Sequence, residues 1–209
     1  MTTTFKHPAT VETVGNQFIC FDTMETDGSW TSTFDTDVSE YPTVTEIEVA
    51  DNTDSYDSYA SGKIYESDAP VTSKTITVTN IAFDSITIEK MKGADIDGGA
   101  VLSGGTKNTR PYFAYGVDVI NKDKTHEYRW YPKCKLTDND DKTSTSADKH
   151  SDQTKQLTIT AYGFDDDGHI DCKVFTSEKG YENVKAADFF TKPILTLADA
   201  KKLGTAAGA

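Results

Sequence analysis

The chain has 209 residues and a formal net charge of −13 at pH 7, and only two of its 21 basic residues, Arg110 and Arg129, are arginines. This charge argues against a protein that binds nucleic acids or anionic membrane surfaces, because both partners require a cationic surface. No apolar run approaches the roughly 20 residues of a membrane-spanning helix. A count of 31 threonines favours half-solvated β-strands over disorder, provided that the spacing agrees.

The N-terminal 42 residues have weak periodicity, with one dense apolar patch at Phe18–Phe21. They lack the charged and apolar regions of a signal peptide. We predict that residues 1–42 form an arm of a single domain, whose β-sandwich core spans residues 43–176.

Six segments of this core alternate apolar and polar side chains with a period of two, which is typical of antiparallel strands with one buried face. The segments are Thr45–Val49, Lys74–Thr79, Tyr112–Ile120, Tyr128–Leu136, Leu157–Phe164 and Ile170–Val174. In the fourth segment, the pattern places Tyr128, Trp130, Cys134 and Leu136 on one face. We therefore expect Trp130 to be buried between two packed sheets.

One short helix is predicted near residues 83–92, between the second and third strands. Asp84 is a candidate N-cap, and Gly93 is a candidate terminating glycine. Phe83, Ile86 and Met91 lie on one helical stripe, although Ile86 and Ile88 around Thr87 also fit a strand.

The connections between the later strands are polar. A short loop at Asn121–His126 predicts a hairpin, and Asp165–Gly168 predicts a second hairpin that joins the last two strands. Residues 137–153 form a long polar stretch, which in a compact domain indicates a functional or mobile loop. Residues 177–209 are predicted to be a C-terminal arm with short helices at Val184–Phe190 and Leu195–Leu203.

Two acidic clusters are candidate cation sites. The cluster Asp165–Asp171 is rich in oxygen ligands, but Gly168 falls at position four of an EF-hand loop instead of position six. A tight turn explains this cluster better. The second cluster, formed by Asp138, Asp140 and Asp141, is better explained as a solvated run of charge.

No catalytic or cofactor motif is present. The four histidines, His7, His126, His150 and His169, lie in polar contexts typical of the surface, and none belongs to a zinc-binding motif. The pairs Gly98-Gly99 and Gly104-Gly105 precede no helix, so they predict no phosphate loop. We expect no catalytic, cofactor-binding or metal-binding residue, and we expect that the protein is not an enzyme.

The three cysteines, Cys20, Cys134 and Cys172, are an odd number at distant positions. This pattern predicts free thiols in a reducing compartment.

The order of these elements resembles the major tail protein family of long-tailed, non-contractile phages that infect Gram-positive bacteria. The resemblance covers about Tyr59 to Thr176. It is carried by Tyr65–Val71 before a strand, Ile86–Gly93 as the short helix, Pro111–Gly116 as the opening of a hairpin, the aromatic strand Tyr128–Leu136 and the penultimate strand Gln156–Gly163.

The resemblance implies a mainly β (α+β) fold, with two packed antiparallel sheets flanked by one short helix and extended terminal arms. It also implies a structural virion protein that is assembled in the host cytoplasm into stacked hexameric rings. These rings would form the tail tube, together with tape measure, tail terminator and distal tail proteins. DNA would pass the lumen without specific binding, and no cofactor or membrane would be involved.

Two alternatives remain open. The chain could be a β-sandwich module that binds carbohydrate or a receptor, with Trp30, Tyr56 and Tyr59 lining a sugar site. An enzyme with scattered catalytic residues is the other alternative, and no motif supports it.

Overall fold

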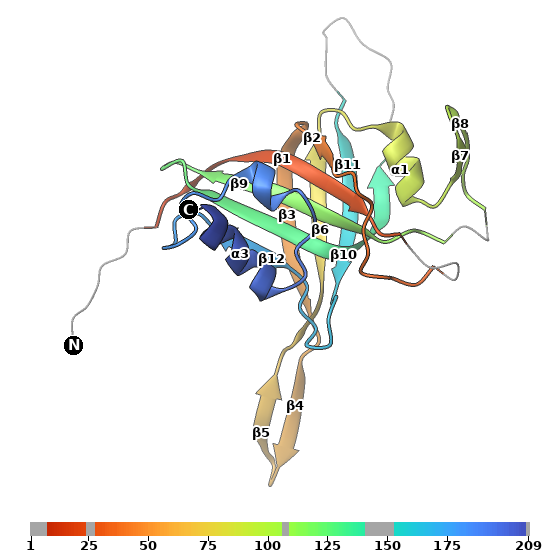
Figure 1. Ribbon diagram of the computed structural model, residues 1–209. Helices are drawn as coiled ribbons and strands as arrows, with labels where there is room; N and C mark the ends of the chain where they lie inside the picture. Colours follow the sequence, from red (N-terminus) through yellow and green to blue (C-terminus); the bar gives the residue numbers. More distant parts are fainter. Residues whose placement is uncertain (1–7, 24–27, 106–108, 141–152, 208–209) are drawn as a thin grey trace, which may run out of the picture.

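The computed structural model describes residues 8–23, 28–105, 109–140 and 153–207 (Figure 1). The fold is mainly β, as expected. Eight strands form one antiparallel sheet in the order β2-β1-β9-β10-β11-β6-β3, and β12 pairs with β10. Those strands are β1 (Val11–Phe21), β2 (Ser39–Tyr41), β3 (Val44–Thr53), β6 (Val71–Asn80), β9 (Phe113–Asn121), β10 (His126–Asp140), β11 (Lys155–Tyr162) and β12 (Cys172–Phe175).

Two small hairpins and three helices complete the described chain. They are β4 (Tyr56–Ala60) with β5 (Lys63–Asp68), β7 (Asp95–Asp97) with β8 (Ala100–Leu102), α1 (Ser85–Met91), α2 (Ala186–Phe189) and α3 (Leu197–Ala207). All six predicted strands are confirmed, as β3, β6, β9, β10, β11 and β12. The predicted hairpin at Asn121–His126 is also confirmed, because β9 and β10 pair from Ile120 and His126 onward.

The long strand β10 holds the sheet together. On one edge it pairs with β9 as far as Cys134, and on the other edge it pairs first with β12 and then with β11. Its pairing with β9 shifts register between Tyr131 and Cys134. This interval contains Pro132, which has no N–H to donate to a ladder. Figure 1 shows β1, β9 and β10 crossing β3, β6 and β11, so one bent sheet supplies both layers of the expected sandwich.

The predicted hairpin at Asp165–Gly168 is wrong as a connection between paired strands. Among the described residues, β11 and β12 do not pair with each other, because they follow one another along the same edge of β10. The Asp-Gly turn itself exists: Gly168 has a φ of 78°, and its N–H donates to the Asp165 carbonyl at 3.1 Å. This turn lies within residues 163–171, which connect β11 to β12 near the Pro132 bulge of β10.

The bulge also changes which side chains share a face. Tyr131, Cys134 and Leu136 belong to the inner core between the two halves of the sheet. Trp130 is fully buried, but the prediction that it lies between the two packed sheets is wrong, because it lies on the opposite face with Tyr128 and packs against Phe189 and Phe190. A one-residue slip in a strand sends every later side chain to the other face, so the prediction of one shared face is wrong.

The N-terminal arm prediction is also corrected, because β1 lies within the large sheet between β2 and β9. Two register shifts, between Val11 and Thr13 and between Val14 and Gln17, interrupt its alternation. The end of β1 is buried on both faces, since Ile19 belongs to the inner core while Phe18 belongs to the outer core. Burial on both faces explains the uninterrupted apolar patch.

The C-terminal residues likewise pack against the sheet and form no extended arm within 177–207. Val184, Phe189, Phe190 and Ile194 are buried in the outer core with Trp130. The two helices predicted there occur as α2 and α3, with the second one shifted by two residues at its start. Their apolar residues are spread over short pieces, which hides a helical period.

Helix α1 confirms the predicted capping. The Asp84 carboxylate accepts a hydrogen bond from Thr87 N at 2.8 Å, and Gly93 has a φ of 76°. The stripe differs by one member, because Ile88 is buried with Phe83 and Met91 whereas Ile86 is 45% exposed. The predicted loop at 137–153 begins later than expected, since β10 continues to Asp140. Residues 141–152 lie outside the described residues.

Replacing Trp130 with Ala should lower the free energy of unfolding by about 3–5 kcal/mol, because a fully buried ring is lost. Its indole N–H also donates to the Phe189 carbonyl at 3.1 Å. Trp130→Phe keeps most of the packing and loses this bond, so it should cost less. Urea unfolding measures both variants, and a loss well below 1 kcal/mol for Trp130→Ala would contradict this burial.

Replacing Asp84 with Ala should cost about 0.5–2 kcal/mol at pH 7, the usual range for an N-cap. The hydrogen bond from the Thr87 side chain is the main cause that lowers the pKa of Asp84. A lowered pKa in the folded state adds stability at high pH, and this stability is lost as the carboxylate protonates. The difference between wild type and variant in urea unfolding should therefore shrink below about pH 4. A constant difference down to pH 2 would contradict the cap.

Candidate functional site: the projecting β4–β5 hairpin

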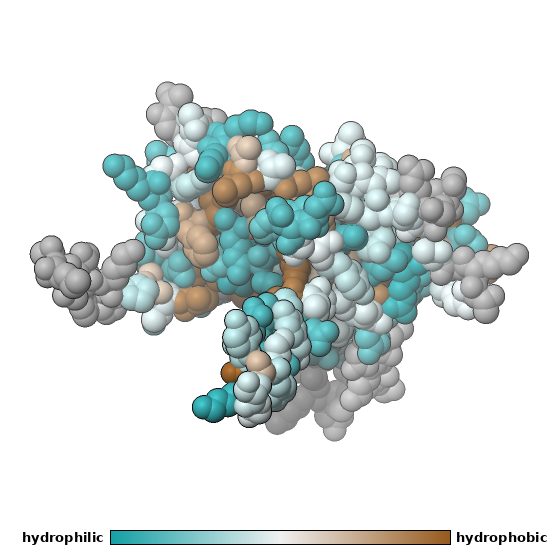
Figure 2. All heavy atoms as spheres, turned by 90° about the horizontal axis from the view of Figure 1, so that it is seen from below, coloured by the Kyte–Doolittle hydropathy of each residue, from teal (hydrophilic) through white to brown (hydrophobic). Residues whose placement is uncertain are grey.

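The hairpin formed by β4 and β5 extends beyond the sheet. It continues the β3–β6 ladder, which ends at the pair Thr53 and Val71, and Asp54 N donates to the Pro70 carbonyl at 3.1 Å between the two ladders. Figure 1 shows the hairpin standing away from the body, and Figure 2 views it end-on. None of its strand positions was predicted, because Tyr56–Asp68 lacks a clean period of two.

The tip of the hairpin is a two-residue turn. Ser61 and Gly62 have φ values of 53° and 74°, and the flanking residues Ala60 and Lys63 are paired. Positive φ at both central positions is the geometry that matches the twist of a hairpin. The Ser-Gly dipeptide was the sequence signal that could have located this turn.

Large side chains of the hairpin are exposed. Tyr65 is 79% exposed and Tyr59 is 70% exposed, with Tyr56 and Ile64 above one half. A two-stranded hairpin without a packed face is only marginally stable in water. Exposed aromatic side chains on such an element indicate a surface that binds another molecule.

Strand β3 beside the hairpin is an edge of the large sheet. It is ten residues long, whereas β2 at the opposite edge has three residues. Ile47 and Val49 pack toward the core, and Glu46 and Glu48 are exposed. A long edge strand offers unpaired backbone groups to another strand, and outward charges limit unspecific pairing.

The predicted acidic clusters are placed differently from each other. In the first, ligand atoms of Asp165, Asp167 and His169 lie within 4.8 Å of one another, and all three residues are exposed. His169 donates its backbone N–H to Asp165 Oδ1 at 2.8 Å, and its Nδ1 lies 2.6 Å from Asp165 Oδ2. These bonds stabilise the turn, and two carboxylates fall short of the six to eight oxygens of a calcium site.

The second acidic cluster lies at the end of β10. Asp138 is exposed there, Asp140 ends the strand, and Asp141 lies outside the described residues. The histidines His7 and His150 also lie outside them. The interpretation of this cluster as a solvated run of charge stays a prediction.

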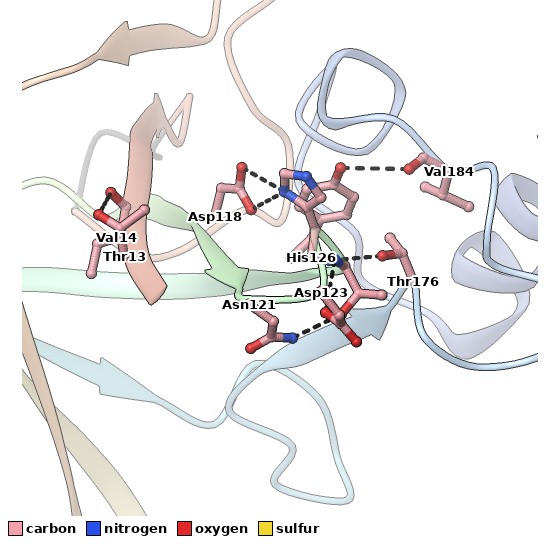
Figure 3. Close-up of polar contacts among 10 residues, drawn as sticks. Thr13, Val14, Asp118, Asn121, Asp123, His126, Thr176 and Val184 are labelled. Atoms are coloured by element: carbon pink, nitrogen blue, oxygen red, sulfur yellow. Dashed lines mark hydrogen bonds and ion pairs between the residues drawn. The ribbon is translucent and has the colours of Figure 1, made fainter. Parts of the chain in front are cut away.

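His126 differs from the predicted surface histidine. Its Nδ1 lies 2.9 Å from the carboxylate of Asp118, whose side chain is only 10% exposed (Figure 3). The His126 backbone N–H donates a hydrogen bond to Thr176 Oγ1 at 2.7 Å. Burial raises the pKa of Asp118, and His126 offsets this only in part. The His126–Asp118 pair thus joins β10 to β9, and the bond to Thr176 fastens this hairpin to the residue that follows β12.

The three aromatic residues expected to line the alternative sugar site lie on different elements of the structure. Trp30 lies beneath the ammonium of Lys133, 5.0 Å from the ring centre, whereas Tyr56 and Tyr59 lie on the projecting hairpin. The pair Gly98-Gly99 forms the turn between β7 and β8. Strand β8 follows it directly.

The three cysteines are free, as predicted. Cys20 and Cys134 are buried, and Cys172 is half-buried. Burial raises the pKa of Cys20 and of Cys172 to about 11, which keeps both thiols protonated and poorly reactive at neutral pH. No helix within the described ranges combines the length and the apolar composition needed to cross a membrane.

Comparison with known proteins found no matching family model and no matching curated protein. Among solved structures, the chain is similar to the cryo-EM structure of the anti-feeding prophage cap, the AFP tube terminating cap. The identity is 10% and the TM-score is 0.46, over 84% of this chain and 96% of that chain. A similarity at this level assigns neither a family nor a function.

Replacing Asp118 with Asn should leave the free energy of unfolding at pH 7 equal or higher, because a buried carboxylate is removed. A raised pKa in the folded state favours folding at low pH, and this contribution is lost as pH rises through it. Wild type should therefore gain stability relative to the variant as the pH falls toward 4.

Asp165→Asn is the matched control. Desolvation alone would raise the pKa of Asp165, but the hydrogen bonds from His169 outweigh it and lower the pKa. The control should thus show the opposite trend, with its largest deficit at neutral pH. Urea unfolding at pH 7 and pH 4 compares the two variants. The same pH trend in both would contradict the opposite pKa shifts of Asp118 and Asp165.

Proposed function

We propose that this protein is a major tail protein, a structural subunit whose copies assemble into stacked hexameric rings and form the tail tube of a long-tailed phage. The observation that carries the proposal is the β4–β5 hairpin. It extends beyond the sheet with exposed Tyr59 and Tyr65 and has no packing partner among the described residues of its own chain.

Three further features support this proposal. The succession of strands, short helix and aromatic hairpin strand resembles the major tail protein family over residues 59–176. The long edge strand β3 suits pairing between subunits, since closing a sheet removes its edges. The net charge of −13 suits a conduit, because a negative wall repels the phosphates of DNA within a Debye length of about 8–10 Å.

In this proposal the protein performs no catalysis and carries no cofactor. Its partners are other copies of itself and the tape measure, tail terminator and distal tail proteins, and its place is the virion tail after assembly in the host cytoplasm. Genome delivery through the tube is its role.

A second candidate function is a β-sandwich module that binds carbohydrate or a receptor. Exposed Tyr56, Tyr59 and Tyr65 favour it, because aromatic rings commonly stack on sugars and line protein interfaces. Such a module would stay small in solution and retain a ligand.

Negative-stain microscopy of the purified full chain, with light scattering of the same sample, distinguishes the two functions. We expect rings or tubes several times the 22.9 kDa mass of one chain. A sample that stays monomeric from micromolar to millimolar concentration, and at all salt concentrations, would contradict the tail-tube proposal.

Assembly should become easier as salt rises from 50 to 500 mM, because screening weakens repulsion between chains of like charge. The tubes should retain no double-stranded DNA at 50 mM salt, where any attraction between protein and phosphate is strongest. Sedimentation with labelled DNA measures both effects. Retention of DNA at low salt would contradict a negative lumen, even if tubes form.

A further inference from the structure

Three aspartates of the chain are followed directly by a glycine: Asp27, Asp97 and Asp167. An Asp-Gly sequence is chemically labile, because glycine has no Cβ to shield its backbone nitrogen from the carboxyl group beside it. Asp27 lies outside the described residues. The other two aspartates lie in turns of different structure, and this difference predicts different chemistry.

We propose that Asp97 is a site of spontaneous conversion to isoaspartate, whereas the fold protects Asp167 from the same reaction. In the first step the backbone nitrogen of Gly98 forms a bond to Cγ of the protonated Asp97, and the carboxyl hydroxyl leaves with the amide proton as water. A water molecule then opens the five-membered imide. Attack at the backbone carbonyl gives isoaspartate, and attack at the side-chain carbonyl restores aspartate.

The backbone nitrogen of Gly98 is free to react. Gly98 and Gly99 form the two-residue turn between β7 and β8, and the flanking residues Asp97 and Ala100 are paired. Gly98 has a φ of 58°, a geometry that favours glycine at the first position of such a turn. Its N–H donates to no carbonyl among the described residues. A Cβ added at Gly98 or Gly99 would meet no atom within 4 Å, so the turn is also uncrowded.

The hairpin that carries Asp97 is held weakly. Strands β7 and β8 have three residues each, none of them fully buried, and within the described chain they pair with no other strand. Figure 1 shows this hairpin apart from the large sheet. A two-stranded hairpin of this kind is only marginally stable in water. Ring closure requires Asp97 to leave its extended backbone conformation, and local opening of a marginal hairpin costs little free energy.

The turn at Asp167 is held by several hydrogen bonds. The N–H of Gly168, which would be the attacking nitrogen, donates to the Asp165 carbonyl at 3.1 Å. The His169 N–H donates to Asp165 Oδ1 at 2.8 Å, and the Phe164 N–H donates to the His169 carbonyl at 2.9 Å. Exposure does not distinguish the two sites, because Asp167 is exposed as well. The hydrogen bonds instead fix the backbone of this turn and oppose ring closure.

Isoaspartate changes the hairpin and leaves both cores intact, because no residue of β7 or β8 belongs to either core. The backbone of an isoaspartate runs through the side-chain carbonyl, so one methylene group is added before the turn. A two-residue turn fixes the register of its strands, and the longer backbone breaks the pair of Asp97 with Ala100. The reaction takes place within one chain, so its test is independent of the tail-tube proposal.

Ageing of the purified full chain at neutral pH tests the proposal. The protein is digested with a protease that cleaves before aspartate and leaves isoaspartate uncut, and the peptides are identified by liquid chromatography and mass spectrometry. Isoaspartate should accumulate at Asp97 at least tenfold faster than at Asp167. In denaturing urea the two sites should react at similar rates, because the turns are absent. Equal rates in the folded protein, no product at Asp97, or a tenfold difference that persists in urea would each overturn the proposal.

Two matched variants give a second readout. In Asp97→Asn and Asp167→Asn the same ring closes with loss of ammonia, and its hydrolysis raises the mass of the chain. The Asp97→Asn chain should gain this mass at least tenfold faster than the Asp167→Asn chain, with circular dichroism showing both folded. Asp97→Glu is the negative control, because the longer side chain cannot close a five-membered ring and the product should disappear. Equal rates in the two Asn variants would overturn the protection of Asp167.

Discussion

The interruption of β10 at Pro132 is the constraint on which the rest of the structure depends. A proline cannot donate to a ladder, so the strand cannot keep one register with β9 along its length. On the opposite edge, the same interval is where β12 gives way to β11. One bent strand thus joins two groups of strands that enclose a common core. The long connection at 163–171 spans the same interval, because it links the strand on one side of it to the strand on the other.

The change of face at Pro132 creates the second core. Trp130 points away from the inner core and packs edge-on against Phe190, with 5.5 Å between the ring centres. The rings come so close to β9 that a Cβ added at Gly116 would lie 2.9 Å from both of them. The C-terminal residues therefore complete the domain, because without Phe189 and Phe190 the outer face of β10 would expose its aromatic side chains.

Two groups of exposed apolar side chains lie outside both cores, at the two ends of β6. The β4–β5 hairpin buries none of its large side chains, and Ile81, which follows β6, and Ile86 in the first turn of α1 are exposed. Apolar side chains at the two ends of one ladder contribute little to the folding of the single chain. Their position instead suits association, where removing them from water supplies the driving force.

The sequence by itself determined the elements whose side chains obey a local rule. Alternation located six strands, Asp84 and Gly93 located α1, and Asn121–His126 located a hairpin, because in each case neighbouring residues carry the whole signal. The tertiary structure alone decided those features that depend on residues far apart in the sequence. Bulges in β1 removed its period, so the placement of Phe18–Phe21 in a central strand required β9. The face of Trp130 depended on the register shift at Pro132. The pairing of His126 with Asp118, and the isolation of Tyr59 and Tyr65, depended on which strands lie side by side.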